Sequence, residues 1–333
     1  MRRTWIAGAA TTMLLAAGCA GGDGAAVDPA DPVTIDITVT NATETYTVPW
    51  LVGMDQGFFT ERGVRIGELV PGQGGSTTLR NLISGDLAIG EVSYPAVVDA
   101  AAEGTPVAAV GGAFQSLYGN DFYALSSNTA VQRIEDVRTW AFTNPGSVTE
   151  SLTHLIPEAA GIGDRAVERV AAGGIGEGVA LLESGAVDVA IVPDAVRAKN
   201  PDTFRLVVPT HTYIERFQQT VLTTTTDYAE DNPEVVSAVL GGYQESADWI
   251  HGHIDEAGAL YAAHTDLPLE SAVAAVRSAA ELDTWSAGVS PEALDSAQRA
   301  VQLAGFEGEI PYCDLFDPTF LPEGTQFRLP VTC

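Results

Sequence analysis

Basic side chains are scarce in this sequence of 333 residues. Lys and Arg together number 16 against 44 Asp and Glu, the formal net charge is −28, and Lys199 is the only lysine. Nucleic acids and anionic lipid surfaces are recognised through basic patches, so we expect neither to be a partner. A single lysine also argues against Schiff-base and pyridoxal chemistry. The acidity itself indicates a solvated surface coat, either suited to high salt or produced by coding bias.

The sequence also lacks the short motifs of common enzymes. It contains no Gly-x-Ser-x-Gly, no His-Glu-x-x-His, no P-loop and no Gly-x-Gly-x-x-Gly after an expected strand. His251 and His253 are two residues apart in an expected helix and so point to different faces, which argues against a shared metal ion. We predict a protein that is not an enzyme and has neither a cofactor nor a metal site.

Long hydrophobic runs are absent too, because the apolar stretch 5–17 is too short to span a bilayer. It follows Arg2 and Arg3 and ends at Gly18-Cys19, as in a secretory signal peptide. The segment 15–19 resembles the bacterial lipobox, in which the cysteine is lipidated and becomes the mature N-terminus. We therefore expect a signal peptide over 1–18, a lipid anchor on Cys19 that holds the exported protein on the outer face of the cytoplasmic membrane, and a flexible tether over 19–32. A signal peptide cut elsewhere is the alternative, and it would also export the chain.

Cysteine occurs only three times. Lipidation of Cys19 leaves Cys313 and Cys333 as an even pair in an oxidising compartment. We predict a disulfide between them that fastens the C-terminal tail. Closing a loop of about 20 residues contributes roughly 3 kcal/mol in the chain-entropy model. Two unrelated thiols are the alternative.

One phrase occurs twice, over residues 82–89 and again over 181–191. Each copy is typical of a helix that ends at a left-handed glycine, Gly85 or Gly185, and is followed by a buried strand. Two such joints predict two similar α/β lobes. A cleft between two domains is a common place for a small ligand to bind.

Strand and helix patterns alternate along the chain, which is typical of an α/β protein with largely parallel sheets. The expected strands are 33–40, 64–70, 87–92, 107–111, 122–126, 139–143, 168–171, 187–192, 204–208 and 221–225. The expected helices are 46–59, 76–84, 96–103, 148–160, 176–184, 233–253, 257–264, 269–282 and 291–304.

Several segments follow one another as they do in one family of transport proteins. They are 55–64, with the sequence Asp-Gln-Gly-Phe-Phe-Thr-Glu-Arg-Gly-Val, then 74–76, 82–90, 104–107, 134–137, 232–236 and 247–250. In this order they resemble the nitrate/sulfonate/bicarbonate (thiamine-precursor-like) substrate-binding proteins of ABC importers. The resemblance covers residues 33–305.

The resemblance implies a two-lobe periplasmic-binding-protein fold of type II. Each lobe would be a mostly parallel sheet flanked by helices, and two hinge strands would join the lobes. We expect the first lobe over 33–121 and 226–333, including the C-terminal helices and tail, and the second lobe with the hinge strands over 122–225. Such a protein would capture a small organic solute as a monomer and deliver it to a cognate ABC permease and its ATPase.

Ligands of open α/β sheets bind beyond the carboxyl ends of the strands, so the loops after the strands supply the candidate residues. In the first lobe these are Asn41, Thr43, Glu44, Tyr46, Gly75, Ser76, Thr77, Ser93 and Tyr94. In the second lobe they are Asn144, Gly146, Ser147, Thr149, Gly174 and Asp194. Helix starts near residues 75 and 147 favour an acceptor or an anion, although helix capping explains the same residue types.

The nature of the ligand stays open between a sulfonate-type anion and a nitrogenous compound. The acidic candidates near expected strand ends favour a cationic or neutral nitrogenous compound, and they are Glu44, Glu91, Asp121 and Asp194. Trp50 is a further candidate for an aromatic wall. Two other functions are possible. One is a ligand-sensing ectodomain lipoprotein, and the other is an enzyme similar to the pyrimidine synthases of thiamine biosynthesis, whose cysteine-rich motif this chain lacks.

Overall fold

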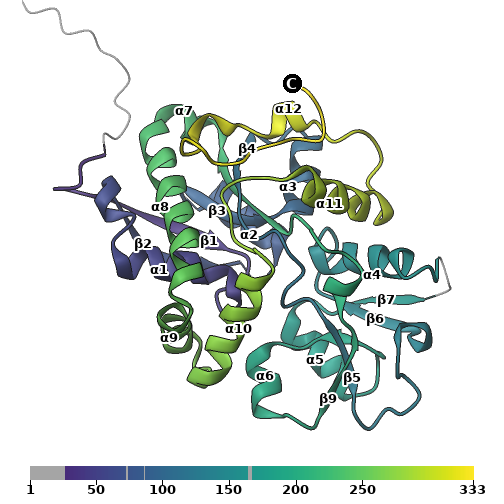
Figure 1. Cartoon of the computed structure of the whole chain (residues 1–333). Helices are drawn as coiled ribbons and strands as arrows, with labels where there is room; N and C mark the ends of the chain where they lie inside the picture. Colours follow the sequence, from purple (N-terminus) through teal and green to yellow (C-terminus); the bar gives the residue numbers. More distant parts are fainter. Residues whose placement is uncertain (1–26, 73, 86, 164–166) are drawn as a thin grey trace, which may run out of the picture.

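The computed structural model describes residues 27–333 except residues 73, 86 and 164–166. The expected signal peptide and Cys19 lie outside the described residues. Two α/β units lie side by side in Figure 1, and we call them the first and the second lobe. No helix in the described part of the chain is both long enough and apolar enough to cross a membrane.

A five-stranded sheet forms the centre of the first lobe. Its strands are β1 (Val33–Val39), β2 (Val64–Pro71), β3 (Ile89–Ser93), β4 (Val107–Gly112) and β10 (Thr220–Thr225), in the order β2-β1-β3-β10-β4. β1 pairs in parallel with β2 and β3, whereas β10 is antiparallel to β3 and β4. All residues of β3 and β4 are buried, as expected of strands covered by helices on both faces.

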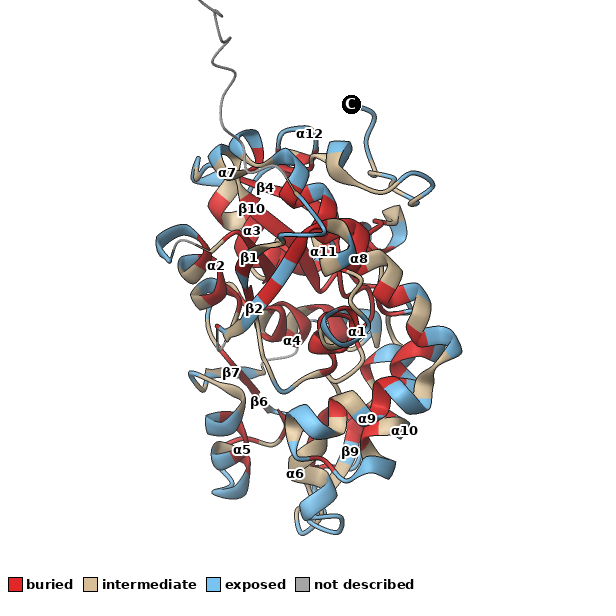
Figure 2. Ribbon diagram, turned by 90° about the vertical axis from the view of Figure 1, so that its left-hand side faces the viewer, coloured by how far each residue is buried: buried red, intermediate tan, exposed pale blue. Residues whose placement is uncertain are grey.

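Helices enclose this sheet, and Figure 2 shows the buried residues along its strands and on the inner sides of the helices. The α-helices are α1 (Val48–Gln56), α2 (Gly75–Ser84), α3 (Tyr94–Ala102), α7 (Thr226–Asp231), α8 (Pro233–Gly252), α9 (Ile254–Thr265), α10 (Leu269–Glu281), α11 (Pro291–Leu303) and α12 (Tyr312–Leu315). Short 3-10 turns are η1 (Thr45–Thr47), η2 (Thr60–Arg62) and η5 (Pro318–Phe320).

The second lobe repeats this arrangement on a smaller scale. Its strands are β5 (Phe122–Leu125), β6 (Thr139–Phe142), β7 (Glu168–Ala171), β8 (Ala190–Ile191) and β9 (Phe204–Val208). Its helices are α4 (Val148–Ala159), α5 (Ile175–Glu183) and α6 (Asp194–Lys199), with the 3-10 turns η3 (Ile134–Asp136) and η4 (Thr210–Thr212). β6 pairs in parallel with β7, and β5 lies antiparallel between β8 and β9. A parallel bridge from Trp140 to Val189 joins the β6-β7 pair to the three-stranded sheet of β8, β5 and β9.

The repeated phrase occupies the same place in both lobes. It leads into β3 and β8, each of which lies between the parallel part of its sheet and the antiparallel strand. Gly185 has the expected left-handed backbone, with φ of 74°. The expectation is wrong for Gly85, whose φ is −113°. There the glycine is needed for space, because a Cβ atom would lie 2.4 Å from the carbonyl oxygen of Asn81.

Two neighbouring segments, 113–121 and 209–219, carry the chain between the lobes. The Gln219 amide donates to the carbonyl oxygen of Phe114 (2.8 Å), and the Gln219 side chain donates to that of Ser116 (2.9 Å). β10 pairs within the first sheet, although the sequence prediction counted it with the second lobe. The division of the chain into 33–121, 122–225 and 226–333 stays a prediction.

The lobes also touch away from these segments. Leu152 and Ile156 of α4 belong to one apolar cluster with Ala297 and Val301 of α11, and the guanidinium of Arg299 pairs with the carboxylate of Glu158 across the same contact. α4 of the second lobe therefore packs on the first lobe.

The ends of the described chain lie against the first lobe. The predicted disulfide between Cys313 and Cys333 is confirmed, with Cα atoms 5.5 Å apart, and it fastens the C-terminal tail to α12. Residues 27–32, expected in the flexible tether, pack near Gly63, where a Cβ atom would lie 2.6 Å from the Asp28 amide nitrogen. The last residues of the expected tether, 27–32, therefore already pack against the first lobe before β1 begins.

Candidate functional site

A cavity of about 340 Å³ lies between the lobes, beyond the carboxyl ends of β1, β3 and β6. Its walls come from both lobes, as a ligand-binding cleft requires. The first lobe and the crossing segments contribute Thr40, Asn41, Glu44, Tyr46, Pro71, Gly74, Gly75, Ser93, Gly119, Asn120, Gln219 and Thr220. The second lobe contributes Thr143, Ser147, Val148, Thr149, Gly173, Gly174, Ile175, Gly176, Glu177 and Ile191.

The structure brings about half of the predicted site residues together in this cavity. Those that line it are Asn41, Glu44, Tyr46, Gly75, Ser93, Ser147, Thr149 and Gly174. Those that do not are Thr43, Ser76, Thr77, Tyr94, Asn144, Gly146 and Asp194. The binding role of the first group stays a prediction.

Local structure explains why the second group lies elsewhere. Thr43 and Ser76 are exposed, and Thr77 lies within the first turn of α2. The Tyr94 ring is buried under α3, where its hydroxyl donates to that of Tyr312 (3.3 Å). Asp194 was expected in a loop but begins α6.

Asn144 and Gly146 lie at the edge where the lobes meet. The Asn144 side chain donates to the Gly173 carbonyl oxygen (3.2 Å), and a Cβ atom at Gly74 of the first lobe would lie 3.4 Å from its Nδ2 atom. A Cβ atom at Gly146 would lie 3.2 Å from the Asp99 carboxylate of α3. These residues lie where the two rims come close together, outside the cavity wall.

The start of α2 is one part of the cavity wall with free hydrogen-bonding groups. The helix begins at Gly74 and Gly75 with no side-chain cap, although the first amides of a helix have no partner within it. Ser93 lies beside this end, and its Oγ atom would be 1.7 Å from a Cβ atom at Gly75, so only glycine fits. The Ser93 side chain is 2% exposed, and its hydroxyl has no hydrogen-bond partner among the described residues. These groups can receive an acceptor group of a ligand.

In the second lobe the start of α4 is capped by its own side chains, whereas the start of α5 has no side-chain cap. The Ser147 hydroxyl accepts from the Glu150 amide (3.2 Å) and is 2.9 Å from the Thr149 hydroxyl, which accepts from the Thr143 amide (2.9 Å). At α5, the Glu177 carboxylate lies over Gly174, so close that a Cβ atom there would be 2.4 Å away. Hydrogen bonds within the second lobe, including the helix cap, therefore already involve the hydroxyls of Ser147 and Thr149.

Glu44 gives the cavity an acidic character. Its carboxyl group lines the cavity, and burial raises its pKa to about 8, helped by the nearby charge of Asp194 and opposed by that of Arg197. Glu44 and Glu177 are the charged residues of the wall, and no Arg, Lys or His lines the cavity in the described part of the chain. A sulfonate or nitrate would find no cationic side chain here.

Glu91 and Trp50, both weaker candidates for the wall, lie underneath the cavity. The Trp50 indole donates to one Glu91 oxygen (2.7 Å), and the Thr220 hydroxyl donates to the other (2.8 Å). Both residues have no exposed surface. Burial raises the pKa of Glu91 to about 7, although the two hydrogen bonds lower it. Because Thr220 lines the cavity, this carboxyl group supports its floor.

Sequence reasoning missed the contribution of the crossing segments. Gly119, Asn120, Gln219 and Thr220 line the cavity, and the Tyr46 hydroxyl donates to the Gln219 side chain. The only available signal was that the chain must pass between the lobes twice, which does not show which side chains face inward.

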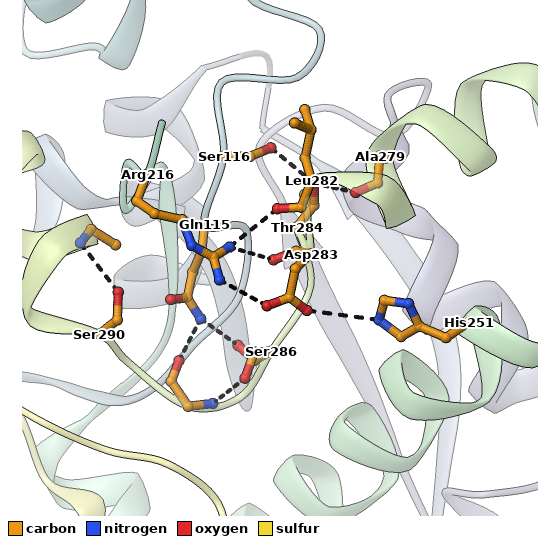
Figure 3. A network of polar contacts seen from close by, with 12 residues as sticks. Gln115, Ser116, Arg216, His251, Ala279, Leu282, Asp283, Thr284, Ser286 and Ser290 are labelled. Atoms are coloured by element: carbon orange, nitrogen blue, oxygen red, sulfur yellow. Dashed lines mark hydrogen bonds and ion pairs between the residues drawn. The ribbon is translucent and has the colours of Figure 1, made fainter. Parts of the chain in front are cut away.

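A second, larger hollow of about 810 Å³ lies within the first lobe, between α8, the loop 283–292 and the C-terminal tail. Several of its polar side chains are paired within one network, which Figure 3 shows. Arg216 donates to the Asp283 carboxylate (2.7 Å), His251 lies 3.8 Å from that carboxylate, and Gln115 donates to the Gly288 carbonyl oxygen (2.7 Å). The smaller cavity between the lobes is the candidate ligand site, because both lobes line it and the buried Ser93 hydroxyl in its wall has no partner among the described residues.

Comparison with known proteins supports the fold. The model of the family described as NMT1/THI5 like matches residues 44–257, whereas no curated protein matches the sequence. The periplasmic aliphatic sulphonate binding protein SsuA from Escherichia coli is 17% identical, with a TM-score of 0.63 over 82% of this chain and 92% of that chain. The ligand-binding component of an ABC-type import system from Staphylococcus aureus is 12% identical, with a TM-score of 0.70 over 88% and 99%.

An enzyme shares the same fold. The desulfurization enzyme DSZB is 15% identical, with a TM-score of 0.56 over 86% of this chain and 97% of that chain. The expected periplasmic-binding-protein fold is confirmed by these likenesses. Because both binding proteins and an enzyme have it, the function has to be argued from the cavity.

The support of the cavity floor by Trp50 is testable. We expect Trp50→Phe to remove a donor from the buried Glu91 carboxyl group and to cost about 1–3 kcal/mol of unfolding free energy near pH 8, beyond the loss of packing. Because the pKa of Glu91 is raised in the folded state, its contribution to the free energy of unfolding is full below the ordinary pKa of 4.5. That contribution is lost as the pH rises through about 7. Removing the donor raises that pKa further, so the extra cost should shrink towards pH 5, as urea unfolding at several pH values would show.

Trp140→Phe is the matched control. Trp140 has no exposed surface either, and its indole nitrogen has no hydrogen-bond partner among the described residues. Trp140→Phe should lower the free energy of unfolding by the same amount at every pH. An equal pH dependence of the two variants would contradict the role given to Trp50.

Proposed function

The chain belongs to the NMT1/THI5-like family, and we propose that it is an exported solute-binding lipoprotein of an ABC-type importer. In this role it captures a small organic solute between its lobes and delivers it to a membrane permease driven by an ATPase. Binding requires no chemistry, and we assign no catalytic residue to the chain. The fold shared with SsuA and the Staphylococcus aureus import component supports this role.

The observation that carries the proposal is the cavity that both lobes enclose. Its wall holds the Ser93 hydroxyl, which is buried without a partner among the described residues, together with the uncapped α2 start and the Glu44 carboxyl group. Unpaired buried polar groups cost stability, and such groups in a binding protein are supplied with partners by the ligand.

The charges of the cavity support a nitrogenous solute, cationic or neutral, as the ligand. Glu44 offers an acceptor to an N–H group of the solute, and the α2 amides with Ser93 offer donors to an acceptor atom at its other end. An anion with no N–H group, such as an alkanesulfonate or nitrate, would meet the Glu44 carboxyl group without a basic residue to offset it.

Lipid anchoring on Cys19 is part of the same proposal. We expect the exported chain to begin at a Cys19 that carries acyl groups, which would hold the protein at the membrane where the permease lies. Mass spectrometry of the N-terminal peptide and fractionation of cells that express the wild type or Cys19→Ser would check it. A wild-type chain that begins at another, unmodified residue would contradict the anchor and leave export standing.

A thermal-shift screen of the exported chain tests the solute class. Amines, pyrimidines and other nitrogenous solutes should raise the unfolding midpoint, because a ligand that binds only the native state stabilises it by mass action. Ser93→Ala should weaken the best solute by about 2- to 13-fold, corresponding to one hydrogen bond of about 0.5–1.5 kcal/mol. It should not lower the stability of the empty chain, because the hydroxyl has no partner there.

Ser76→Ala is the matched control for this variant. Ser76 is exposed and lies outside the cavity wall, so its loss should leave the affinity unchanged. If nitrate and sulfonates stabilise the chain while nitrogenous solutes do nothing, the proposed solute class is wrong. If Ser93→Ala and Ser76→Ala behave alike, the proposed site is wrong.

A further inference from the structure

Two contacts between the lobes, away from the crossing segments, differ in kind. α4 of the second lobe packs against α11 of the first, and α6 of the second lobe packs against α10 of the first. Figure 1 shows these contacts at separate places along the boundary between the lobes. A movement that keeps one contact can therefore part the other, as in hinge opening.

The α4–α11 contact is apolar and closed to solvent. Leu152 and Ile156 of α4 and Ala297 of α11 have no exposed surface, and Val301 of α11 is 3% exposed. These side chains belong to one apolar cluster that continues into both lobes. Parting the two helices would expose them to water, and the free-energy cost of doing so grows with the apolar area exposed. The contact therefore resists opening.

α11 is in turn fastened to the first lobe. In the loop before the helix, the carbonyl oxygen of Ala287 accepts from the Gly112 amide of β4 (2.8 Å). On the helix itself, the Gln298 side chain accepts from the Tyr312 hydroxyl of α12 (2.7 Å). α11 cannot follow α4 away from the first lobe without breaking these hydrogen bonds. The contact thus joins α4 to the body of the first lobe.

The α6–α10 contact is partly open to solvent. None of the six residues of α6 is buried. Ala195 packs against the apolar cluster of α1, α8, α9 and α10 but stays partly exposed. The Asp194 carboxylate accepts from the Tyr118 hydroxyl of the crossing segment (3.1 Å). Opening at α6 exposes little apolar surface, and water can replace the polar partner.

The mouth of the cavity is also free to widen. Pro71 of the first lobe and Gly173 of the second line the cavity and are exposed, so the cavity meets solvent between them. Asn144, which lies near Gly74 of the first lobe, uses its amide for a hydrogen bond to Gly173 within its own lobe (3.2 Å). This hydrogen bond is kept when the rims separate.

We propose that the α4–α11 contact is the pivot of the cleft. When the cleft opens, α4 stays packed on α11, and the second lobe swings away from the first at α6 and at the cavity mouth. Thr149, at the start of α4, then stays close to its place in the cavity wall, whereas the α5 start with Glu177 moves away. This inference goes beyond the proposed function, because it describes how the lobes move and does not depend on which solute binds.

Two pairs of nitroxide spin labels test the pivot in the empty exported chain. Ala159→Cys with Asp295→Cys labels α4 and α11, and Lys199→Cys with Glu270→Cys labels α6 and α10. All four positions are exposed, so the labels leave the contacts themselves intact. Electron paramagnetic resonance measures the distribution of distances between the two labels of each pair.

Ser76→Cys with Glu270→Cys is the matched control pair, because both exposed positions belong to the first lobe. Its distribution shows the width that the labels alone produce. A Cys19→Ser chain serves as the background for every pair, since Cys313 and Cys333 are disulfide-bonded and the introduced cysteines are then the only free thiols.

The two pairs should behave differently. The α4–α11 pair should give a single distribution as narrow as that of the control pair, because the contact stays closed. The α6–α10 pair should give a broader distribution, and its mean distance should exceed that in the structure by more than about 2 Å, as in other domain rearrangements.

Either of two results would overturn the proposal. In the first, the α4–α11 pair is as broad as the α6–α10 pair or broader, which means that the lobes part at α11. In the second, both pairs are as narrow as the control pair, which means that the lobes do not part at all. The proposed function fails separately, when sulfonates and nitrate but no nitrogenous solute stabilise the wild type.

Discussion

The site depends on one constraint, namely that the chain passes between two sheets through a pair of adjacent segments. Segments 113–121 and 209–219 are hydrogen-bonded to each other, so the lobes are held with the carboxyl ends of β1, β3 and β6 facing one cleft. Each of these strands is followed by a helix start or a short loop, and these form the walls. The crossing segments themselves form part of the wall through Asn120 and Gln219.

Within that frame parts of the cavity wall differ in chemistry. One part has the uncapped start of α2 and the unpaired Ser93 hydroxyl, which offer donors. Another has Glu44, which offers an acceptor. In the second lobe Ser147 caps the start of α4, whereas the start of α5 has no side-chain cap and lies beside the Glu177 carboxylate.

Much of the fold could be predicted from the sequence, because periodic apolar patterns and the repeated joint at Gly85 and Gly185 depend on local structure. The expected strands and long helices occur, most with ends within two residues. Short helices such as α6 were missed, since six residues carry too little periodicity, and this placed Asp194 in a loop. The place of β10 in the first sheet was also missed, because pairing between distant strands has no local signal.

The site was predictable only as a set of loops. The rule about strand ends found Glu44, Gly75 and Ser93, but it could not tell Ser93, which faces the cavity, from Tyr94, which is buried beside it. That difference depends on side-chain direction in the packed structure. The same limit applies to Glu91, whose carboxyl group turns under the floor to meet Trp50.

The central claim is that one solute-binding cavity lies between the lobes, with Glu44 and the α2 start in its wall. A crystal structure of the exported chain with its most stabilising nitrogenous solute tests it most directly. We predict a solute nitrogen about 2.7–3.2 Å from the Glu44 carboxyl group and an acceptor atom of the solute at the Ser93 hydroxyl. Solute bound instead in the hollow between α8 and the C-terminal tail would contradict the account.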